Sequence, residues 1–392
     1  MVNRFLTPSN SSSFFLFGAR GVGKSTFLKT WFEGRAPLWF DLLDPDLEQR
    51  FSLDPKQFQQ EIISAKQGGP GPPWVVVDEI QKCPKLLNLV HLLIEEQGVR
   101  FALTGSSARR LKQKGVNLLA GRAFVEHLFP LTSDELGDGF DLDHALQWGT
   151  LPRLLQLPDA KDKAQFLRSY CLTYLETEIK AEQWVRKLDP FRRFLQVAAQ
   201  CNGKILNLSN IAKDVGADWT TVAGYFEILE DTLMGFLLEP YHPSVRKRQA
   251  KRPKFYFFDG GVRRALAMEQ SVPLLPRTSA YGDAFESFLI LEVHRRNMYL
   301  KRDFRLSYLR TKDDAEIDLI LERPGTGPAI IEIKSKTVVD ERDARTLNAF
   351  AQSMKGAEAF LLSQDPRPKQ IGAVRALYWR EGLQELGLSL GR

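Results

Sequence analysis

The sequence predicts an α/β protein of several domains, and three observations support this prediction. Strand-like apolar runs alternate with helix-like segments over residues 1–150, which is typical of a parallel sheet covered by helices. A helical pattern with apolar residues at three- and four-residue spacing follows over residues 141–189. A second α/β pattern begins near Ala280, with strands expected at residues 315–320 and 329–334. At 392 residues, the chain is also too long for a single core.

The bulk composition is that of a soluble globular protein, with 43% apolar and 26% charged residues. No apolar run approaches the length of a membrane span, and no signal-like segment is recognised at the N-terminus. The scattered cysteines Cys83, Cys171 and Cys201 predict neither a disulfide framework nor a zinc site. We therefore expect a cytoplasmic protein that does not act in a membrane.

The net charge of +6 is concentrated in one segment of the chain. Between His242 and Arg264, eight basic residues face one acid, Asp259. A local basic patch of this kind indicates a polyanionic partner such as DNA, and a solvated loop is the alternative. The residues expected to contact nucleic acid are Arg246, Lys247, Arg248, Lys251, Arg252 and Lys254.

Residues 18–25 match the phosphate-binding pattern G-x-x-x-x-G-K-[ST] without a mismatch. A predicted strand at residues 14–17 precedes them and a predicted helix at residues 26–32 follows, which is the context that the pattern requires. Backbone N–H groups of such a loop bind a triphosphate. Lys24 is expected to reach the β- and γ-phosphates of ATP, and Ser25 to ligate Mg²⁺. The expected ATP-binding residues are Gly18, Arg20, Gly21, Val22, Gly23, Lys24, Ser25 and Thr26.

Two acidic residues follow the next buried strand of this region, which is expected at residues 74–77. Ligands of parallel sheets lie at the carboxyl ends of the strands. Asp78 is therefore expected beside the Mg²⁺, and Glu79 is expected to orient and polarise an attacking water. This pair predicts hydrolysis of the nucleotide rather than its storage. The alternative is a strand that ends in solvated acids.

Polar residues also follow a third predicted strand. Thr104 and Ser106 are candidates for sensing the γ-phosphate, and ordinary turn chemistry is the alternative. Arg122 is a candidate arginine finger that would stabilise transition-state charge on a neighbouring subunit's nucleotide. Arg109 and Arg110 are alternative candidates for that role, and a structural ion pair is the other interpretation of Arg122.

Residues 190–275 are predicted to form a winged helix. Helices are expected at residues 191–199, 209–215 and 219–232, and wing strands at residues 233–241 and 254–258. The third helix carries Glu227, Glu230 and Asp231, which repel phosphate, so readout of the major groove is not expected. Contacts from the basic wing to the DNA backbone are expected instead, with little sequence specificity. The alternative is a module that only packs between domains.

Carboxylates occur in a recognisable order within residues 276–392. Glu286 lies on a predicted helix, Asp318 on a predicted strand, and Glu332 and Lys334 on one face of the next strand. The spacing is typical of restriction-endonuclease-like domains. Such carboxylates can hold Mg²⁺ or Mn²⁺ while the lysine activates a water against a phosphodiester. A scaffold that only binds DNA, and structural ion pairs, are the alternatives.

Taken together, these motifs resemble those of the bacterial and archaeal predicted AAA-type ATPases that carry a C-terminal domain of unknown function. The resemblance covers nearly the whole chain. Beyond the phosphate-binding loop, it is carried by residues 75–82, 103–109, 119–122, 149–152, 174–179, 256–262 and 282–286. It implies a P-loop AAA-type ATPase core (1–140), a helical lid (141–189), a winged-helix-like middle (190–275) and a restriction-endonuclease-like end (276–392).

The leading hypothesis is an ATPase that remodels or translocates DNA. A homo-oligomeric ring is expected if Arg122 acts on a neighbouring subunit, and a hexamer is the usual closed form of this superfamily. Two alternatives come from other classes of protein. One is an ATP-dependent switch or scaffold for a protein partner, and the other is an ATP-regulated, metal-dependent DNA nuclease.

Overall fold

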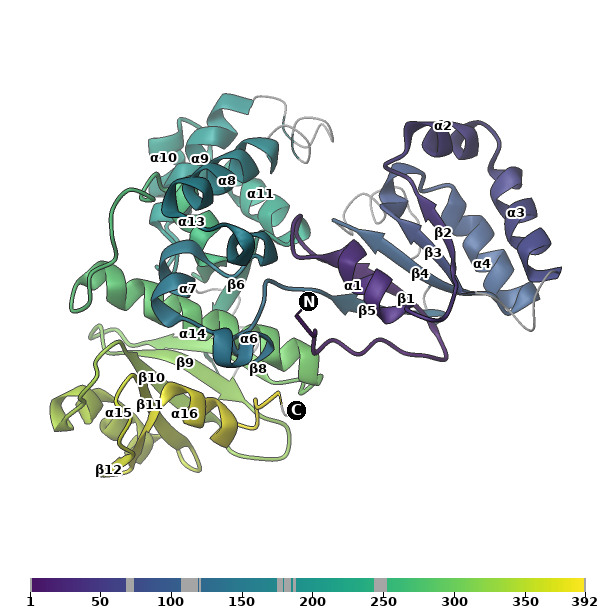
Figure 1. Ribbon diagram of the computed structural model, residues 1–392. Helices are drawn as coiled ribbons and strands as arrows, with labels where there is room; N and C mark the ends of the chain where they lie inside the picture. Colours follow the sequence, from purple (N-terminus) through teal and green to yellow (C-terminus); the bar gives the residue numbers. More distant parts are fainter. Residues whose placement is uncertain are drawn as a thin grey trace. The chain divides into compact units, whose positions relative to one another are not determined.

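The computed structural model describes residues 2–67, 74–106, 119, 121–174, 179, 185, 188–242 and 252–390. The chain divides into two compact units (Figure 1). The N-terminal unit is Asn3–Pro130 with Asp231–Leu233, and the C-terminal unit is Leu131–Glu230 and Met234–Arg392 with Met1–Val2. No helix within these described ranges is long and apolar enough to cross a membrane. The N-terminal stretch of the first unit ends at Pro130, whereas the predicted core range is 1–140.

A five-stranded parallel sheet in the order β2-β3-β4-β1-β5 forms the centre of the N-terminal unit. Its strands are β1 (Ser13–Phe17), β2 (Leu38–Asp41), β3 (Trp74–Asp78), β4 (Arg100–Gly105) and β5 (Ala123–His127). The strands expected at residues 14–17 and 74–77 are β1 and β3, and the third predicted strand is β4. Because these three strands are neighbours and parallel, the loops that leave their carboxyl ends meet at one edge of the sheet.

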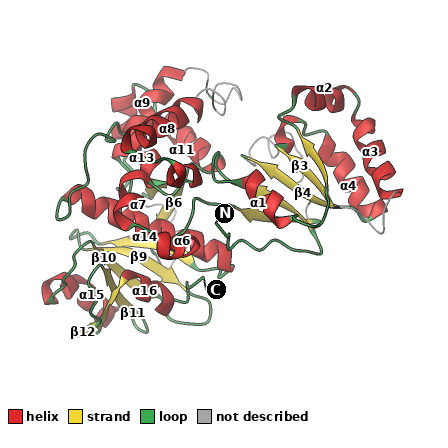
Figure 2. Cartoon of the chain, in the orientation of Figure 1, coloured by secondary structure: helices red, strands yellow, loops and turns green. Residues whose placement is uncertain are grey.

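Helices pack beside this sheet (Figure 2). They are α1 (Lys24–Trp31), α2 (Pro45–Leu53), α3 (Pro55–Gln67), the short η1 (Ile80–Lys82) and α4 (Leu86–Gln97). Phe40 of β2 contacts Phe51 of α2 and Phe58 of α3 with ring centroids 5.4 and 5.1 Å apart. All three rings are at most 3% exposed. Burial of these aromatic side chains holds α2 and α3 against the edge strand of the sheet.

An eight-stranded mixed sheet in the order β12-β13-β11-β10-β9-β8-β6-β7 forms the C-terminal unit. Its strands are β6 (Gly235–Pro240), β7 (Lys254–Phe257), β8 (Arg305–Arg310), β9 (Glu316–Glu322), β10 (Ala329–Lys334), β11 (Glu358–Ser363), β12 (Lys369–Ile371) and β13 (Val374–Tyr378). The predicted wing strands are the antiparallel hairpin β6–β7. They do not stand alone, because Glu239 and Pro240 of β6 pair in parallel with Ser307 and Tyr308 of β8. The hairpin is therefore the edge of the C-terminal sheet.

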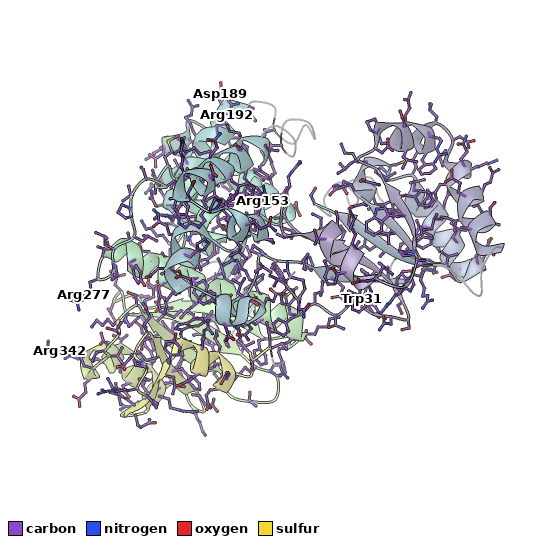
Figure 3. The ribbon with its side chains drawn as sticks, viewed as in Figure 1. Trp31, Arg153, Asp189, Arg192, Arg277 and Arg342 are labelled. Atoms are coloured by element: carbon purple, nitrogen blue, oxygen red, sulfur yellow. The ribbon has the colours of Figure 1, made fainter. Side chains whose placement is uncertain are left out.

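Helices make up the rest of the regular structure described in this unit. They are α6 (Ser133–Leu136), η2 (Gly137–Gly139), α7 (Leu142–Trp148), η3 (Pro152–Gln156), α8 (Ala160–Thr173), α9 (Leu188–Gln200), α10 (Leu208–Val215), α11 (Trp219–Asp231), α13 (Gly260–Leu266), α14 (Ser279–Leu300), α15 (Glu341–Ser353) and α16 (Trp379–Glu385). The helices α9, α10 and α11 correspond to the three expected before the wing. An exposed ion pair of 3.6 Å joins Asp189 to Arg192 in the first turn of α9 (Figure 3).

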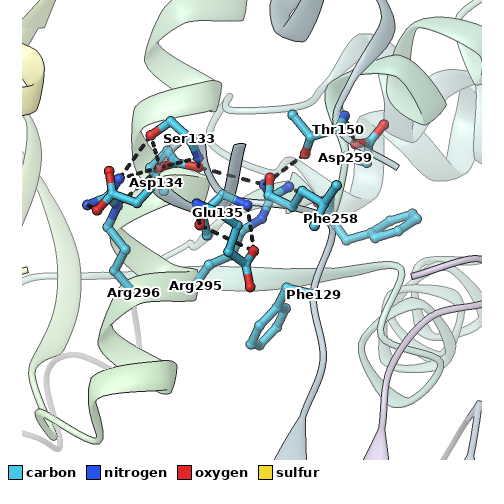
Figure 4. Close-up of polar contacts among 12 residues, drawn as sticks. Phe129, Ser133, Asp134, Glu135, Thr150, Phe258, Asp259, Arg295 and Arg296 are labelled. Atoms are coloured by element: carbon cyan, nitrogen blue, oxygen red, sulfur yellow. Dashed lines mark hydrogen bonds and ion pairs between the residues drawn. The ribbon is translucent and has the colours of Figure 1, made fainter. Parts of the chain in front are cut away.

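A buried charged network fastens the beginning of the C-terminal unit to α14. Glu292 and Arg296 are 0% and 2% exposed and form an ion pair of 3.0 Å. The hydroxyl of Ser133 donates to Glu292 at 2.7 Å, and Arg296 donates to Asp134 at 2.7 Å (Figure 4). Because these charges are removed from water, each must be satisfied by the others.

Asp259 joins two glycine-containing segments that are far apart in the sequence. Its carboxylate accepts hydrogen bonds from the N–H groups of Thr150 at 2.8 Å and Gly261 at 2.9 Å. Gly149 has a φ of +83°, and a Cβ there would lie 2.1 Å from Asp259 Oδ1. Burial raises the pKa of Asp259, while the hydrogen bond from Thr150 and the nearby Arg295 lower it. The segments 149–152 and 259–262 are thus joined by hydrogen bonds through the carboxylate of Asp259.

Replacement of Arg296 tests whether the buried network holds the C-terminal unit together. We expect Arg296→Met to lower the free energy of unfolding by about 3–5 kcal/mol, because it leaves Glu292 buried without its cation. Urea denaturation followed by circular dichroism measures this change.

Arg192→Met is the matched control, since that arginine pairs with Asp189 at the surface and exposed pairs contribute at most about 1 kcal/mol. We expect Glu292→Met combined with Arg296→Met to recover part of the lost stability. An equal and small loss for Arg296→Met and Arg192→Met would contradict the structural importance of the network.

Candidate functional site

The phosphate-binding loop connects β1 to α1 and needs its glycines for conformational reasons. Gly21 and Gly23 have φ values of +79° and +95°, a region that residues with a side chain rarely adopt. A Cβ at Gly18 would lie 2.5 Å from the carbonyl oxygen of Leu128. Gly23 is the N-cap of α1 and provides no capping side chain. The N–H groups of the first helical turn therefore lack a side-chain acceptor from the cap and suit an anion.

Lys24 and Ser25 extend from this loop toward the positions that the sequence predicts. Lys24 is 7% exposed, and its Nζ donates to the carbonyl oxygens of Gly18 at 2.8 Å and Ala19 at 3.5 Å. The hydroxyl of Ser25 donates to Asp78 Oδ2 at 2.7 Å. Hydroxyl and carboxylate oxygens are ligands that Mg²⁺ prefers, so this pair fits the expected ion. Of the other predicted loop residues, Arg20 and Thr26 are exposed and Val22 is buried.

Thr104 connects the two acidic residues at the end of β3. Its hydroxyl donates a hydrogen bond to Asp78 Oδ1 and accepts one from the backbone N–H of Glu79, at an N–O distance of 3.0 Å. Glu79 has a φ of +59°, a left-handed conformation that costs a non-glycine residue about 1–3 kcal/mol. The sequence predicts Thr104 as a γ-phosphate sensor. In the structure its hydroxyl bonds to both acidic residues and can position them, and the sensor role stays a prediction.

Gln81 is a member of the site that the sequence pattern does not identify. It is 5% exposed, and its Nε2 donates to Glu79 Oε2 and to the hydroxyl of Ser106, the latter at 3.3 Å. The predicted sensor Ser106 is thereby linked to Glu79 through one amide. Gln81 lies within the segment that carries the family resemblance, but an amide has no assigned role in the pattern. Its part in the site is seen only in the structure, where it is buried and bonded to Glu79.

The predicted arginine finger forms an ion pair within its own unit. Arg122 Nε pairs with Glu95 Oε1 of α4, and the Arg122 side chain is 36% exposed. A structural ion pair of this kind is the alternative to the finger role that the sequence left open for Arg122. The competing candidates Arg109 and Arg110 lie outside the described residues.

A second group of charged residues lies in the C-terminal unit. Its acids are Glu286 of α14, Glu316 and Asp318 of β9, and Glu332 of β10, and we call these four the carboxylate cluster. Lys334 pairs with Glu332, and the backbone N–H of Ile333 donates to Asp318 at 2.8 Å. The structure thus brings together the four predicted residues Glu286, Asp318, Glu332 and Lys334. It adds Glu316, which the alternation of β9 places on the same face as Asp318.

Burial and mutual repulsion disfavour the ionised forms of three acids of the carboxylate cluster, Glu286, Asp318 and Glu332. Burial, and then the charge of Asp318, raise the pKa of Glu286 to about 8 and that of Glu332 to about 7. Burial also raises the pKa of Asp318. Glu332 Oε2 is buried without a hydrogen-bond partner. The hydroxyl of Tyr256 donates to Glu286 at 3.0 Å.

Lys254 lies in this cluster, which differs from its expected place on an exposed basic wing. The residue is 3% exposed, and its Nζ forms an ion pair with Glu316 and lies 3.8 Å from Glu286. A lysine held in this way is removed from any DNA-binding surface. Arg252 is exposed, as predicted for a phosphate contact. The other four predicted contacts, Arg246, Lys247, Arg248 and Lys251, lie outside the described residues.

Curated proteins similar to this chain come from bacteria. Uncharacterized proteins of Mycobacterium tuberculosis and Mycobacterium bovis are each 28% identical over 322 residues, which is 81% of this chain and 69% of theirs. An uncharacterized protein of Haemophilus influenzae is 20% identical over 265 residues, 64% of each chain.

Solved structures are matched only distantly. The Thermotoga maritima RuvB Holliday junction branch migration motor is 15% identical, with a TM-score of 0.27 over 61% of this chain and 86% of its own. AMPPCP-bound DnaA from Aquifex aeolicus is 14% identical, with a TM-score of 0.30 over 57% and 82%. Scores of this size carry no argument about this chain.

Family models match three consecutive segments of the chain. A model described as "AAA domain" matches residues 10–137, which contain the parallel sheet and the phosphate-binding loop. Two models described as "Domain of unknown function", DUF8612 and DUF4143, match residues 139–272 and 281–381. The predicted mixed α/β fold with a P-loop AAA-type domain is thereby confirmed. The matches confirm the predicted resemblance, since an AAA domain is followed in this chain by the C-terminal domain of unknown function DUF4143.

Proposed function

We propose that this protein is an ATPase whose turnover does work on DNA. The observation that carries the ATPase part is the hydrogen-bonded chain from Ser25 through Asp78 to Thr104 and the Glu79 backbone. It joins the phosphate-binding loop to the acidic residues at the end of β3. Asp78 suits the binding of Mg²⁺, and Glu79 beside it supplies the second acid that hydrolysis requires in addition.

The residues of the site suit distinct tasks in hydrolysis. Bound Mg²⁺ supplies positive charge at the phosphate oxygens, and Ser25 and Asp78 would hold it. The ammonium of Lys24, which contacts loop carbonyls in the structure, would contact the β- and γ-phosphates instead. Glu79 would orient the attacking water and accept its proton. Gln81 and Thr104 fix the side chain and the backbone of that glutamate.

The DNA part of the proposal is supported by the basic segment between His242 and Arg264. Arg252 at its described end is exposed, whereas Lys254 and Arg264 are 3% exposed and belong to the interior. We propose contacts from the exposed basic residues to DNA phosphates without readout of base sequence. A nucleotide-controlled scaffold for a protein partner is the alternative, and it predicts no stimulation by DNA.

A ring of subunits, with a hexamer as its usual form, remains part of the proposal. It requires an arginine that reaches the nucleotide of a neighbouring subunit. Arg122 would have to exchange its ion pair with Glu95 for that contact. This exchange is a feature that a ring structure with bound ATP would show directly.

Replacement of Thr104 tests the role of its hydroxyl in positioning the acidic residues. We expect Thr104→Val to lower kcat for ATP between about 10- and 100-fold, because hydrogen bonds to charged groups contribute about 1.5–3 kcal/mol. Thr104→Ser retains the hydroxyl and should keep most of the activity, while Lys24→Ala should abolish turnover. Steady-state phosphate release measures these rates. Equal kcat values for the Val and Ser variants would show that the hydroxyl has no such role.

Titration of the ATPase rate with DNA tests the proposed partner. We expect duplex, branched or single-stranded DNA to stimulate turnover. The DNA concentration that gives half-maximal stimulation should rise at least about tenfold between 50 and 200 mM salt, because phosphate contacts release counterions.

Replacement of Arg246, Lys247 and Arg248 by alanine should weaken this stimulation while the basal rate stays unchanged. If no form of DNA changes the rate of the wild-type protein, the DNA proposal fails and the protein-partner alternative gains support. The ATPase proposal is unaffected by that result.

A further inference from the structure

Lys254 is the most deeply buried cation at the carboxylate cluster. Its side chain is 4% exposed, compared with 34% for Lys334. The ammonium pairs with Glu316, lies 3.8 Å from Glu286 and stands 5.2 Å from the ring centroid of Tyr308. The hairpin β6–β7 fixes its backbone, since Lys254 is paired with Leu238 of β6. Strand pairing therefore holds Lys254 in the cluster, although it lies in the segment matched by DUF8612 and not in the one matched by DUF4143.

The donor set of the cluster is that of a site for a hard divalent cation. It consists of carboxylate oxygens, which Mg²⁺ and Mn²⁺ prefer. Lys254 and Lys334 lie among the four carboxylates, and Arg310 reaches Glu316 at 4.0 Å, so the acids still outnumber the cations if all four are ionised. Glu332 is 9% exposed, and its Oε2 has no hydrogen-bond partner. Glu286, Glu316 and Asp318 are partly exposed, which would give an ion access from solvent.

The carboxylates of the cluster are nevertheless not close enough together to ligate one metal ion. Within the described ranges of the chain, no group of three His, Cys, Asp or Glu side chains is close enough together to hold a metal ion. One oxygen of Glu316 and one of Glu286 face the Lys254 ammonium. A divalent ion placed among the same oxygens would meet the repulsion of a buried positive charge.

We propose that Lys254 is an internal counter-ion that takes the place of a divalent cation in the carboxylate cluster, so that Lys254 and a metal ion exclude each other. In the native protein the cluster is thus closed to Mg²⁺ and Mn²⁺. The exclusion concerns the C-terminal unit and does not depend on ATP hydrolysis. It also explains why we propose no nuclease activity for the native chain, since that alternative requires metal in this cluster.

Binding of Mn²⁺ to Lys254→Gln tests the proposal. Glutamine keeps a polar, hydrogen-bonding side chain that is slightly shorter than lysine, and it removes the charge. We expect the full-length variant, without nucleotide, to bind Mn²⁺ at least tenfold more tightly than the wild-type protein, measured by the electron paramagnetic resonance signal of free Mn²⁺. Addition of Asp318→Asn should abolish the gained binding and thereby assign it to the cluster. Lys254→Arg keeps the charge and should bind no better than the wild type.

Lys213→Gln, on the exposed surface of α10, is the matched control for the change in net charge. If Lys254→Gln is unfolded in metal-free buffer, we expect Mn²⁺ to restore its near-ultraviolet circular dichroism. Equal Mn²⁺ affinity of wild type and Lys254→Gln, or no binding and no refolding of the variant, would overturn the proposal. Both readouts are independent of ATPase activity, so the two proposals can fail separately.

Discussion

The need to satisfy buried carboxylates is the constraint on which both units depend. A carboxylate that leaves water loses much of its solvation and must gain hydrogen bonds or a cation in return. Asp78, Asp259 and Glu292 are 4%, 0% and 0% exposed, and each meets this requirement in a different way. Asp78 uses hydroxyl groups, Asp259 uses backbone N–H groups, and Glu292 uses an arginine together with Ser133. Each solution joins segments that are distant in the sequence.

The choice of partner determines what each buried acid can do. Hydroxyl groups can shift toward a bound ion without leaving a charge behind, so under the proposed function Asp78 would be free to exchange partners with Mg²⁺. An arginine that is itself buried cannot leave without exposing two opposite charges to an apolar interior. Glu292 is therefore suited to holding α6 against α14 and not to reversible binding. This difference separates the acid that we assign to chemistry from the acid that we assign to structure.

Local patterns were sufficient to predict which residues meet at the ends of β1 and β3 in the candidate site. The glycines of the loop, Lys24, Ser25 and the Asp78-Glu79 pair all occur in fixed spacing after apolar strands, and parallel pairing brings them to one edge. The contribution of Gln81 could not be predicted, because it depends on which side chains are buried against Glu79 in three dimensions. The strands β2 and β5 were not predicted either, and both are edge strands whose place depends on pairing with the rest of the sheet. In β9, by contrast, alternation alone would place Glu316 beside Asp318.

The burial of Lys254 shows most clearly why charge counts along a sequence can mislead. Within the basic segment, Lys254 has the same charge as its neighbours and no pattern distinguishes it. Its position depends on β6 pairing with β8, which makes the predicted wing the edge of the C-terminal sheet and directs β7 toward α14 and β9. A winged helix with a free wing would leave that lysine in solvent. The segment between residues 235 and 257 is therefore structurally part of the C-terminal sheet, and a boundary placed after it would separate Lys254 from the carboxylates that it neutralises.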